Sequence, residues 1–343
     1  MITVRDRIDA RLAEFLDGHP APVVAPEVVV AHRVLRVFIL GDGKRIWPML
    51  CYWGWLGAGG ADCEELISAA AALELCHAGL LIHDDIMDAS EVRRGRPTVH
   101  RTLAGLHAGP SANAFGQAAG ILMGVLALGW SDELFAGSGV EPGRLRRGHE
   151  LFNAMRTEVI AGQYLDVMAH NGSEASIDRA CTVIRYKTAK YTVERPLQIG
   201  AALAGAGDEL IARYSAFGVP LGEAFQLRDD LLGMFGDPAV TGKSALDDLR
   251  EGKQTVLIAH ALQYGTPAQA EQLRAWLGNP KLTESGAADL REIVLATGAA
   301  ERVEEMIDER AQTALEELAK APVTPEAAAA LAQLADRIAH RTR

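Results

Sequence analysis

The stretch LELCHAGLLIHDDIMDASEVRRGRPTVH, at residues 73–100, decides how the rest of the chain is organised. It begins as an apolar helical run and ends in a cluster of aspartates, which a pair of arginines follows. Asp84 and Asp88 are four residues apart, and on a helix this spacing places both carboxylates on one face, with Cβ atoms roughly 5–6 Å apart. Two like charges this close repel each other unless a cation lies between them. The stretch therefore predicts a cation site at the end of a helix.

The residue types around this site favour Mg²⁺ and a diphosphate. Mg²⁺ prefers hard oxygen ligands, and it typically takes one or two protein carboxylates while water and phosphate oxygens fill its other positions. Arg93 and Arg94 follow the aspartates, and their planar guanidinium groups can bind phosphate bidentately. The alternative is a solvated acidic helix end followed by a basic loop, because acidic runs of this kind are common.

A second cluster of the same kind supports the metal–diphosphate interpretation. In GEAFQLRDDLLGMFGDPAVTGKSALDDLREGK, at residues 222–253, Asp229 and Asp230 again follow a helical apolar run. Lys243 and Lys253 supply ammonium groups downstream. Two acidic helix faces, each followed by basic residues, could hold one diphosphate through shared Mg²⁺ ions.

Composition limits the fold and the partners. The chain has 343 residues, enough for a sizeable core in one large domain or two. Hydrophobic residues make up 49% and aromatic residues only 6%, which favours helices over strands. The net charge of −11 argues against nucleic acid or an anionic membrane surface as the main partner. Basic residues that bind phosphate must therefore be local.

Cysteine usage and the apolar segments indicate a cytoplasmic protein. The four cysteines form no CxxC pair, which argues against a zinc site or a disulfide framework. The amphipathic start of the chain carries three acidic residues within residues 1–16, unlike a signal peptide. The uncharged segment 111–131 has a strongly apolar part of only about 15 residues, where a membrane span needs roughly 20, so a buried core helix is expected instead.

Apolar spacing along the chain predicts helix after helix, with prolines and glycines between them. We find no alternating strand pattern and no linker that would divide domains. The expectation is a single all-α domain over residues 1–343, a large helical bundle with a central elongated cavity. The expected helices are 4–17, 26–40, 46–57, 62–88, one from Ser111, one from Pro142 to about 170, 175–204 with a break at Pro196, 208–235, and four or five shorter ones after 253.

Six motifs resemble those of the trans-polyprenyl diphosphate synthases, in the same order and with the same spacing, over roughly residues 30–260. The resemblance implies the isoprenoid synthase fold, a homodimer, and condensation of isopentenyl diphosphate with an allylic diphosphate, head to tail. The motifs are GDGKRIWP at 41–48, LIHDDIMD at 81–88, RRGRP at 93–97, GQYLD at 162–166, KTAKYT at 187–192 and FQLRDD at 225–230.

In the reaction that the resemblance implies, Asp84, Asp88 and Asp229 hold Mg²⁺ ions, and three ions are expected when substrate is bound. These ions draw charge onto the allylic diphosphate until its C–O bond breaks. The double bond of isopentenyl diphosphate attacks the resulting cation, and a proton is then lost. The implied catalytic residues are Asp84, Asp88, Arg93, Lys187 and Asp229.

The family pattern also assigns substrate contacts, one set for each diphosphate. Gln163 and Asp166, one turn apart, are expected to face the cavity. Without the family match, His77 could equally be an ordinary core histidine, and Lys187 and Lys243 could be surface lysines. The contacts to the allylic diphosphate or its metals fall to Arg93, Lys187, Thr188, Gln226, Lys243 and Lys253, and those to isopentenyl diphosphate fall to Lys44, His77 and Arg94.

Two positions depart from the family pattern. Trp47 stands where the family usually has an arginine, which removes one contact to isopentenyl diphosphate, and Arg45 is the candidate substitute. Gly233 stands where some members carry a third carboxylate, which leaves Asp229 as the ligand in the second cluster.

Product length depends on what blocks the cavity beneath Asp84. Short-product relatives often carry an aromatic ring four or five residues before the first aspartate, and this chain has none there. We therefore expect the twenty-carbon geranylgeranyl diphosphate, with farnesyl or a longer product as the alternatives. The candidate chain-length residues are Leu73, Cys76, Gly79 and Leu80, with a facing helix around Ile121, Met123 and Trp130.

Two other functions compete. A terpene cyclase also uses an aspartate-rich helix, but its second metal motif mixes Asn, Ser and Glu, whereas this chain has a second aspartate pair. A non-catalytic partner subunit of a heteromeric synthase is conceivable because of Trp47. Such a subunit should have lost acidic residues, and this chain keeps Asp84, Asp88 and Asp229.

Overall fold

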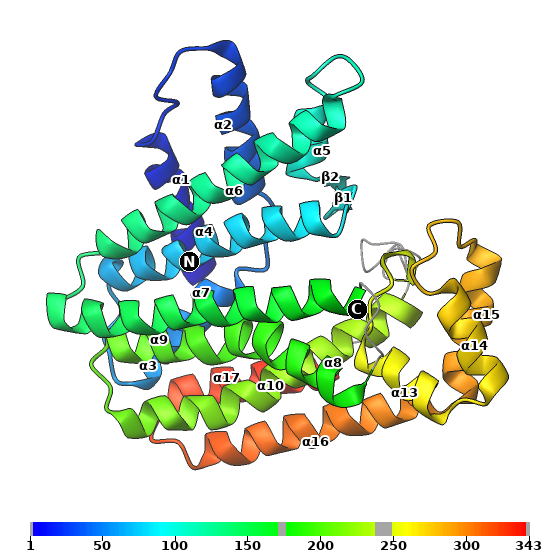
Figure 1. Ribbon diagram of the computed structural model, residues 1–343. Coiled ribbons are helices and arrows are strands. Elements are labelled where there is room, and N and C mark those ends of the chain that lie inside the picture. The colour runs from blue at the N-terminus through cyan, green and yellow to red at the C-terminus, as the bar shows by residue number, and fades with distance from the viewer. Residues whose placement is uncertain (1–2, 171–175, 237–248, 341–343) are drawn as a thin grey trace. The chain divides into compact units, whose positions relative to one another are not determined.

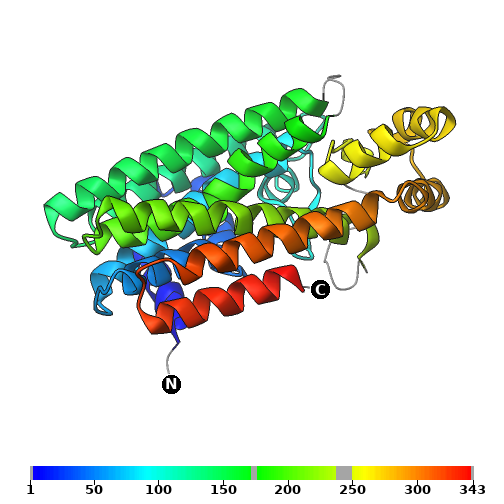
Figure 2. The ribbon, with the colours of Figure 1, turned by 90° about the horizontal axis from the view of Figure 1, so that it is seen from below.

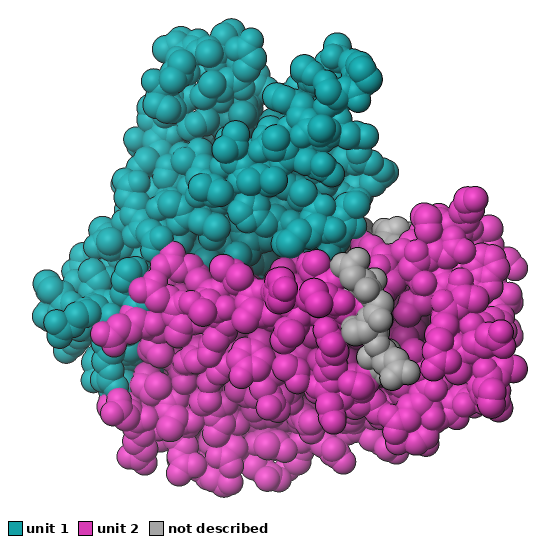
Figure 3. Space-filling model, in the orientation of Figure 1, with its two compact units in different colours: residues 1–149, 199–206 teal, residues 150–198, 207–343 magenta. Residues whose placement is uncertain are grey.

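The computed structural model describes residues 3–170, 176–236 and 249–340. Within these ranges one two-stranded hairpin accompanies helices joined by turns, which confirms the predicted all-α class (Figure 1). The chain divides into two compact units, coloured in Figure 3. Unit 1 comprises residues 1–149 and 199–206, and unit 2 comprises residues 150–198 and 207–343. The assignment of both to a single domain stays a prediction.

Unit 1 is built around two long apolar helices, α4 and α6, which pack against each other along their lengths (Figure 1). The smaller helices and the hairpin surround them. The elements are α1 (Val4–Asp17), α2 (Pro26–Ile39), α3 (Ile46–Gly57), α4 (Glu64–Met87), β1 (Val92–Arg93), β2 (Arg96–Pro97), α5 (Val99–Ala104) and α6 (Ala112–Ala136).

Glycines allow α6 to approach α4 closely. A Cβ on Gly124 would lie 2.2 Å from Nε2 of His83, and one on Gly120 would lie 2.8 Å from Cδ1 of Ile86.

Both helices are long and apolar enough by composition to cross a membrane, but they differ in burial. In α4 78% of the most apolar window is buried, whereas in α6 only 22% of that window is buried. The prediction of a buried helix at 111–131 was therefore wrong for the outer face of α6, where Leu122 is 64% exposed.

The hairpin β1–β2 was not predicted, because its strands are only two residues long. Arg93 pairs with Arg96 across the turn, and the two turn residues both have positive φ, 54° at Arg94 and 71° at Gly95. Two positive φ angles are what a tight two-residue hairpin turn requires. The turn sends the side chains of the arginine pair in different directions.

Unit 2 is a helical layer in which α10 packs against both η1 and α16 (Figure 2). The break predicted at Pro196 is absent, because a π-helix, η1, continues directly into α9 and Pro196 is the second residue of α9. The elements are α7 (Pro142–His170, which starts in unit 1), α8 (Ile177–Val183), η1 (Ile184–Glu194), α9 (Arg195–Leu203, which ends in unit 1), α10 (Asp208–Phe235), α13 (Val256–Tyr264), α14 (Pro267–Trp276), α15 (Glu284–Ala296), α16 (Ala299–Ala319) and α17 (Pro325–Ala339).

Candidate active site

The first aspartate cluster lies in the last turn of α4, in unit 1. Asp84 is half-buried, and Asp88 caps the helix, its N–H donating to the carbonyl of Asp84 over 2.9 Å. Asp85 is only 1% exposed and accepts from Nε of Arg93 at 2.6 Å. The same arginine lies 3.8 Å from Asp84, measured from Nη2 to Oδ2. The hairpin thus holds one predicted phosphate ligand beside the predicted metal ligands.

Electrostatics keep Arg93 charged in this position. Burial alone would lower its pKa, but the Asp85 carboxylate, with Asp84 and Asp88, outweighs burial and raises the pKa. A hydrogen bond between charged groups is stronger than a neutral one, and the bond to Asp85 fixes the guanidinium at the C-terminal end of α4.

The GDGKR turn is held by a buried ion network. Arg45 is 2% exposed and donates from Nη1 to Oε1 of Glu74 at 2.7 Å and from Nε to Oδ1 of Asp9 at 2.7 Å. Its Nη2 also donates to the carbonyl of Gly41. The predicted substrate contact of Arg45 therefore needs correction, because its guanidinium bonds to protein carboxylates inside unit 1 and has a structural role.

The other residues assigned to isopentenyl diphosphate gather around this turn. Lys44 is exposed, and a Cβ on Gly43 would lie 3.3 Å from Nη1 of Arg94. His77 stacks on Trp47, with ring centroids 3.5 Å apart and planes at 19°. Burial, followed by the charges of Arg94 and Arg93, lowers the pKa of His77 well below its ordinary value. The imidazole is therefore neutral near pH 7.

In unit 2 the π-helix carries Lys187 and Thr188. Gly162 of α7 and Gly222 of α10 let both neighbouring helices approach it closely, since a Cβ on Gly162 would lie 2.3 Å from the backbone nitrogen of Lys187. Nζ of Lys187 forms an ion pair with Oδ2 of Asp166 at 2.6 Å. π-helical turns are rare and often lie at functional sites.

The same unit contains a hydrogen-bond chain that links η1 to the second aspartate cluster. The hydroxyl of Thr188 donates to Oε1 of Gln226 at 2.8 Å, and Nε2 of Gln226 donates to Oδ1 of Asp230 at 2.8 Å. Asp229 beside them is exposed on α10. Unit 2 therefore brings together three predicted contacts, Lys187, Thr188 and Gln226, with the aspartate pair.

Three further predicted residues have different surroundings. Lys253 pairs with Glu251 at 2.8 Å, so the ammonium group is close to a carboxylate. Gln163 lies on α7 with its Nε2 buried and no partner among the described residues. Lys243 lies outside the described residues.

The side chains present suit Mg²⁺. No group of three or more His, Cys, Asp or Glu side chains among the described residues forms a closed cluster for a metal ion. Pairs of aspartates at helix ends match Mg²⁺ better than metals that need an all-protein cage, because Mg²⁺ keeps waters and phosphate oxygens as ligands.

The four chain-length candidates lie along α4 with unequal surroundings. Leu73 and Cys76 are fully buried, and Leu80 is half-buried. Gly79 faces α6, where an added Cβ would lie 2.8 Å from the carbonyl oxygen of Gly124. A larger side chain at Gly79 would therefore press on α6, whereas Leu80 has room to change.

Sequence reasoning named no role for several residues that shape the site. Asp85 and Asp230 stand beside predicted ligands in each aspartate pair, and the paired motif was the signal that could have found them. Glu74 gave no local signal, because its partner Arg45 is 29 residues away in the sequence.

Comparison with known proteins gives the family. Residues 29–294 match the family model described as polyprenyl synthetase. The geranylfarnesyl diphosphate synthase of Aeropyrum pernix is 31% identical over 310 residues, 89% of this chain and 92% of that protein. The octaprenyl diphosphate synthase of Escherichia coli is 31% identical over 339 residues, 96% of this chain and 98% of that protein.

Among solved structures, the geranylgeranyl pyrophosphate synthase of Corynebacterium glutamicum, complexed with isoprenyl diphosphate and magnesium, is 40% identical with a TM-score of 0.94. The match covers 99% of each chain. These matches span nearly the whole sequence and both aspartate clusters. The chain belongs to the polyprenyl synthetase family.

Proposed function

We propose that the protein is a Mg²⁺-dependent trans-polyprenyl diphosphate synthase that condenses isopentenyl diphosphate with an allylic diphosphate and makes geranylgeranyl diphosphate. The observation that carries the proposal is the pairing, in a member of this family, of aspartates with phosphate-binding side chains. Unit 1 sets Asp84 and Asp88 beside Arg93, and unit 2 joins Gln226 to Asp230.

The proposed roles follow from charge. Asp84 and Asp88, with Asp229 of the second cluster, would hold Mg²⁺, which when bound neutralises the departing diphosphate. Arg93 adds a fixed positive charge where negative charge accumulates, and such preorganised charge is often the largest contribution to catalysis. Lys44, Arg94 and the neutral imidazole of His77 would orient isopentenyl diphosphate, whose double bond must reach the allylic carbon. That both aspartate clusters bind one diphosphate stays a prediction.

One assay tests this function. Purified protein with Mg²⁺ and labelled isopentenyl diphosphate would receive each of the five-, ten- and fifteen-carbon allylic primers, and the products would be separated by chain length. We expect a twenty-carbon product. Fifteen-carbon or longer products would support the synthase but replace the proposed product, and no elongation with any primer would contradict the proposed function.

Trp47→Arg is expected to lower the KM for isopentenyl diphosphate several-fold, because it would add a cation beside Arg94 and the turn of Lys44. The ring of Trp47 stacks on His77, so a matched variant, Trp47→Phe, keeps an aromatic stack without adding charge and should leave the KM higher than the arginine variant does. Steady-state kinetics at saturating primer would measure both. An unchanged KM in the arginine variant would mean that the tryptophan does not stand in for a lost contact.

Leu80→Phe is expected to shift the product from twenty to fifteen carbons, because a ring one turn below Asp84 would occupy the path of the growing chain. Leu80 is half-buried, and the position can accept the larger side chain with less repacking than Gly79, which touches α6. Leu75→Phe adds the same bulk to a fully buried position of the same helix and is the control for overpacking α4. An unchanged product distribution in Leu80→Phe would remove this residue from chain-length control.

The proposal includes a cytoplasmic homodimer. Support for the dimer comes from the outer face of α6, where Phe115, Ile121, Leu122 and Val125 are between 44% and 64% exposed. Apolar side chains gathered in this way mark an interaction surface. Light scattering should give twice the chain mass, and Leu122→Glu should give a monomer.

A further inference from the structure

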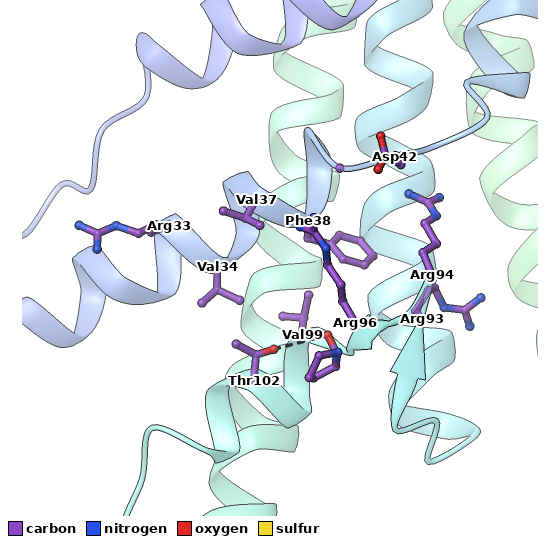
Figure 4. A pocket seen from close by; sticks show the side chains of 12 residues that line it. Arg33, Val34, Val37, Phe38, Asp42, Arg93, Arg94, Arg96, Val99 and Thr102 are labelled. Atoms are coloured by element: carbon purple, nitrogen blue, oxygen red, sulfur yellow. Dashed lines mark hydrogen bonds between the residues drawn. The ribbon is translucent and has the colours of Figure 1, made fainter. Parts of the chain in front are cut away.

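Unit 1 contains a cavity of about 330 Å³ between α2 and the hairpin that carries Arg93 and Arg94 (Figure 4). All of its lining residues belong to α2, to the turn after it, to the hairpin or to α5. Figure 4 shows Arg93 extending away from Arg96, on the side of the hairpin opposite to the α2 wall. The function proposed above uses Arg93 and Arg94 and assigns no role to the other residues of this lining.

One wall of the cavity is apolar. Val34, Val37 and Phe38 of α2 line it together with Pro97 and Val99. Val37 is 51% exposed, which places apolar surface in contact with water inside a concave site. Concave sites of at least about 300 Å³ with apolar walls and a few charged groups are typical small-molecule sites.

The rim of the cavity is positively charged. Arg33, Arg94 and Arg96 line it, and none of the three forms an ion pair among the described residues. Asp42 is the one carboxylate in the lining, so these three arginines outnumber the negative charges there. The fourth arginine, Arg93, is neutralised by Asp85. Burial lowers the pKa of Arg94; the Glu74 carboxylate behind the cavity opposes this effect, and the charges of Arg45 and Arg93 add to it.

We propose that this cavity is an accessory site for a prenyl diphosphate, in which Arg33, Arg94 and Arg96 bind the diphosphate and the α2 wall binds the start of the hydrocarbon tail. Thr102 is the one neutral polar side chain in the lining, so the site offers little to a nucleotide base or a sugar. The volume suits a short tail. The choice of a prenyl diphosphate rests on the proposed function, whose substrates and products are molecules of this class.

Arg94 connects the accessory site to catalysis. The same guanidinium is an expected contact of isopentenyl diphosphate near Gly43 and Lys44. A ligand in the accessory site would hold Arg94, so it should raise the KM for isopentenyl diphosphate. The enzyme would then slow when short prenyl diphosphates accumulate.

Isothermal titration calorimetry of the full chain with geranyl diphosphate in EDTA tests the site. Without Mg²⁺ the aspartate clusters repel a diphosphate, whereas arginines bind it without metal. The double variant Arg33→Ala/Arg96→Ala should weaken binding by about tenfold or more, because it removes two charged hydrogen-bond donors. The matched control, Arg36→Ala/Arg101→Ala, removes two arginines that pair with Asp17 and Glu91 outside the cavity, and should bind as the parent does.

Two further measurements make the result decisive. Geranyl diphosphate should bind at least about tenfold more tightly than inorganic diphosphate, and Val37→Trp should remove that difference by filling the apolar wall. Equal affinity for the two ligands, or unchanged affinity in Arg33→Ala/Arg96→Ala, would overturn the accessory site. Binding in EDTA does not require turnover. A protein that binds geranyl diphosphate but does not elongate it would therefore contradict the proposed synthase function and still support the accessory site.

Discussion

Asp84→Ala is expected to lower kcat for prenyl transfer by about 10³-fold while the fold remains intact. Loss of one group that stabilises developing charge typically costs about 10²- to 10³-fold, and this aspartate would also anchor a metal ion. The fold should survive because the side chain is 22% exposed and its ion pair to Arg93 spans 3.8 Å. Alanine is also the best helix former.

The measurement is product formation from labelled isopentenyl diphosphate over a Mg²⁺ titration, with circular dichroism as the test of folding. Asp289→Ala is the matched control, since Asp289 is an exposed aspartate on α15. Full activity in Asp84→Ala would refute the metal assignment. A loss of helical signal would instead place Asp84 among the structural residues.

The double variant Asp84→Ala/Asp229→Ala tests whether the two clusters serve one diphosphate. If both act on the same leaving group, the double variant should be little slower than the slower single variant, because groups that act as a unit have strongly non-additive effects. Losses that multiply would mean that the clusters act independently.

The sequence predicted the helices well where local signals are strong. The bounds 4–17, 46–57 and 208–235 agree with α1, α3 and α10. For α1 the structure adds a local signal that also stands in the sequence, since Thr3 forms a capping box with Asp6. These signals act over a few residues and can be read from the sequence directly.

The missed hairpin and the absent break at Pro196 are local errors, whereas two others concern partners that are distant in sequence. Arg45 was assigned to a substrate as a substitute for the arginine that Trp47 replaces, yet its guanidinium is buried against Glu74 and Asp9. The segment 111–131 was expected to be buried because it is apolar, but only its glycine face packs on α4. Neither outcome can be derived from local spacing, because each depends on which surface the fold places opposite.

The buried pair of Arg45 and Glu74 should matter more for stability than any surface ion pair. Their side chains are 2% and 4% exposed, and Nη1 lies 2.7 Å from Oε1. Exposed pairs contribute about 0–1 kcal/mol, but removing one partner of a buried pair costs about 3–5 kcal/mol, because the other charge stays buried alone. Arg45 also ties Asp9 of α1 to the turn before α3.

Arg45→Met is therefore expected to lower the free energy of unfolding by about 3–5 kcal/mol. Urea denaturation would measure it. Arg5→Met is the matched control, because Arg5 is 51% exposed, contacts Asp9 at 3.9 Å and donates to the carbonyl of Gly43, so its loss should cost only about 1–2 kcal/mol. The double variant Arg45→Met/Glu74→Leu should regain most of the loss, since it removes both charges. If Arg45→Met proves no more costly than Arg5→Met, the network does not hold unit 1 together.

The decrease in the free energy of unfolding that Arg45→Met causes should also depend on pH. Burial raises the pKa of Glu74 above its ordinary value of 4.5, and Arg45 opposes the increase. Without Arg45 the pKa of Glu74 should rise further. A carboxyl group whose pKa is higher in the folded than in the unfolded state stabilises the fold at low pH. It loses this stabilisation as the pH rises through its folded-state pKa. The variant should thus be closer to the parent in stability at about pH 5 than at about pH 8. A pH-independent difference would show that the lost packing of the arginine stem, and not the unpaired Glu74, causes the destabilisation.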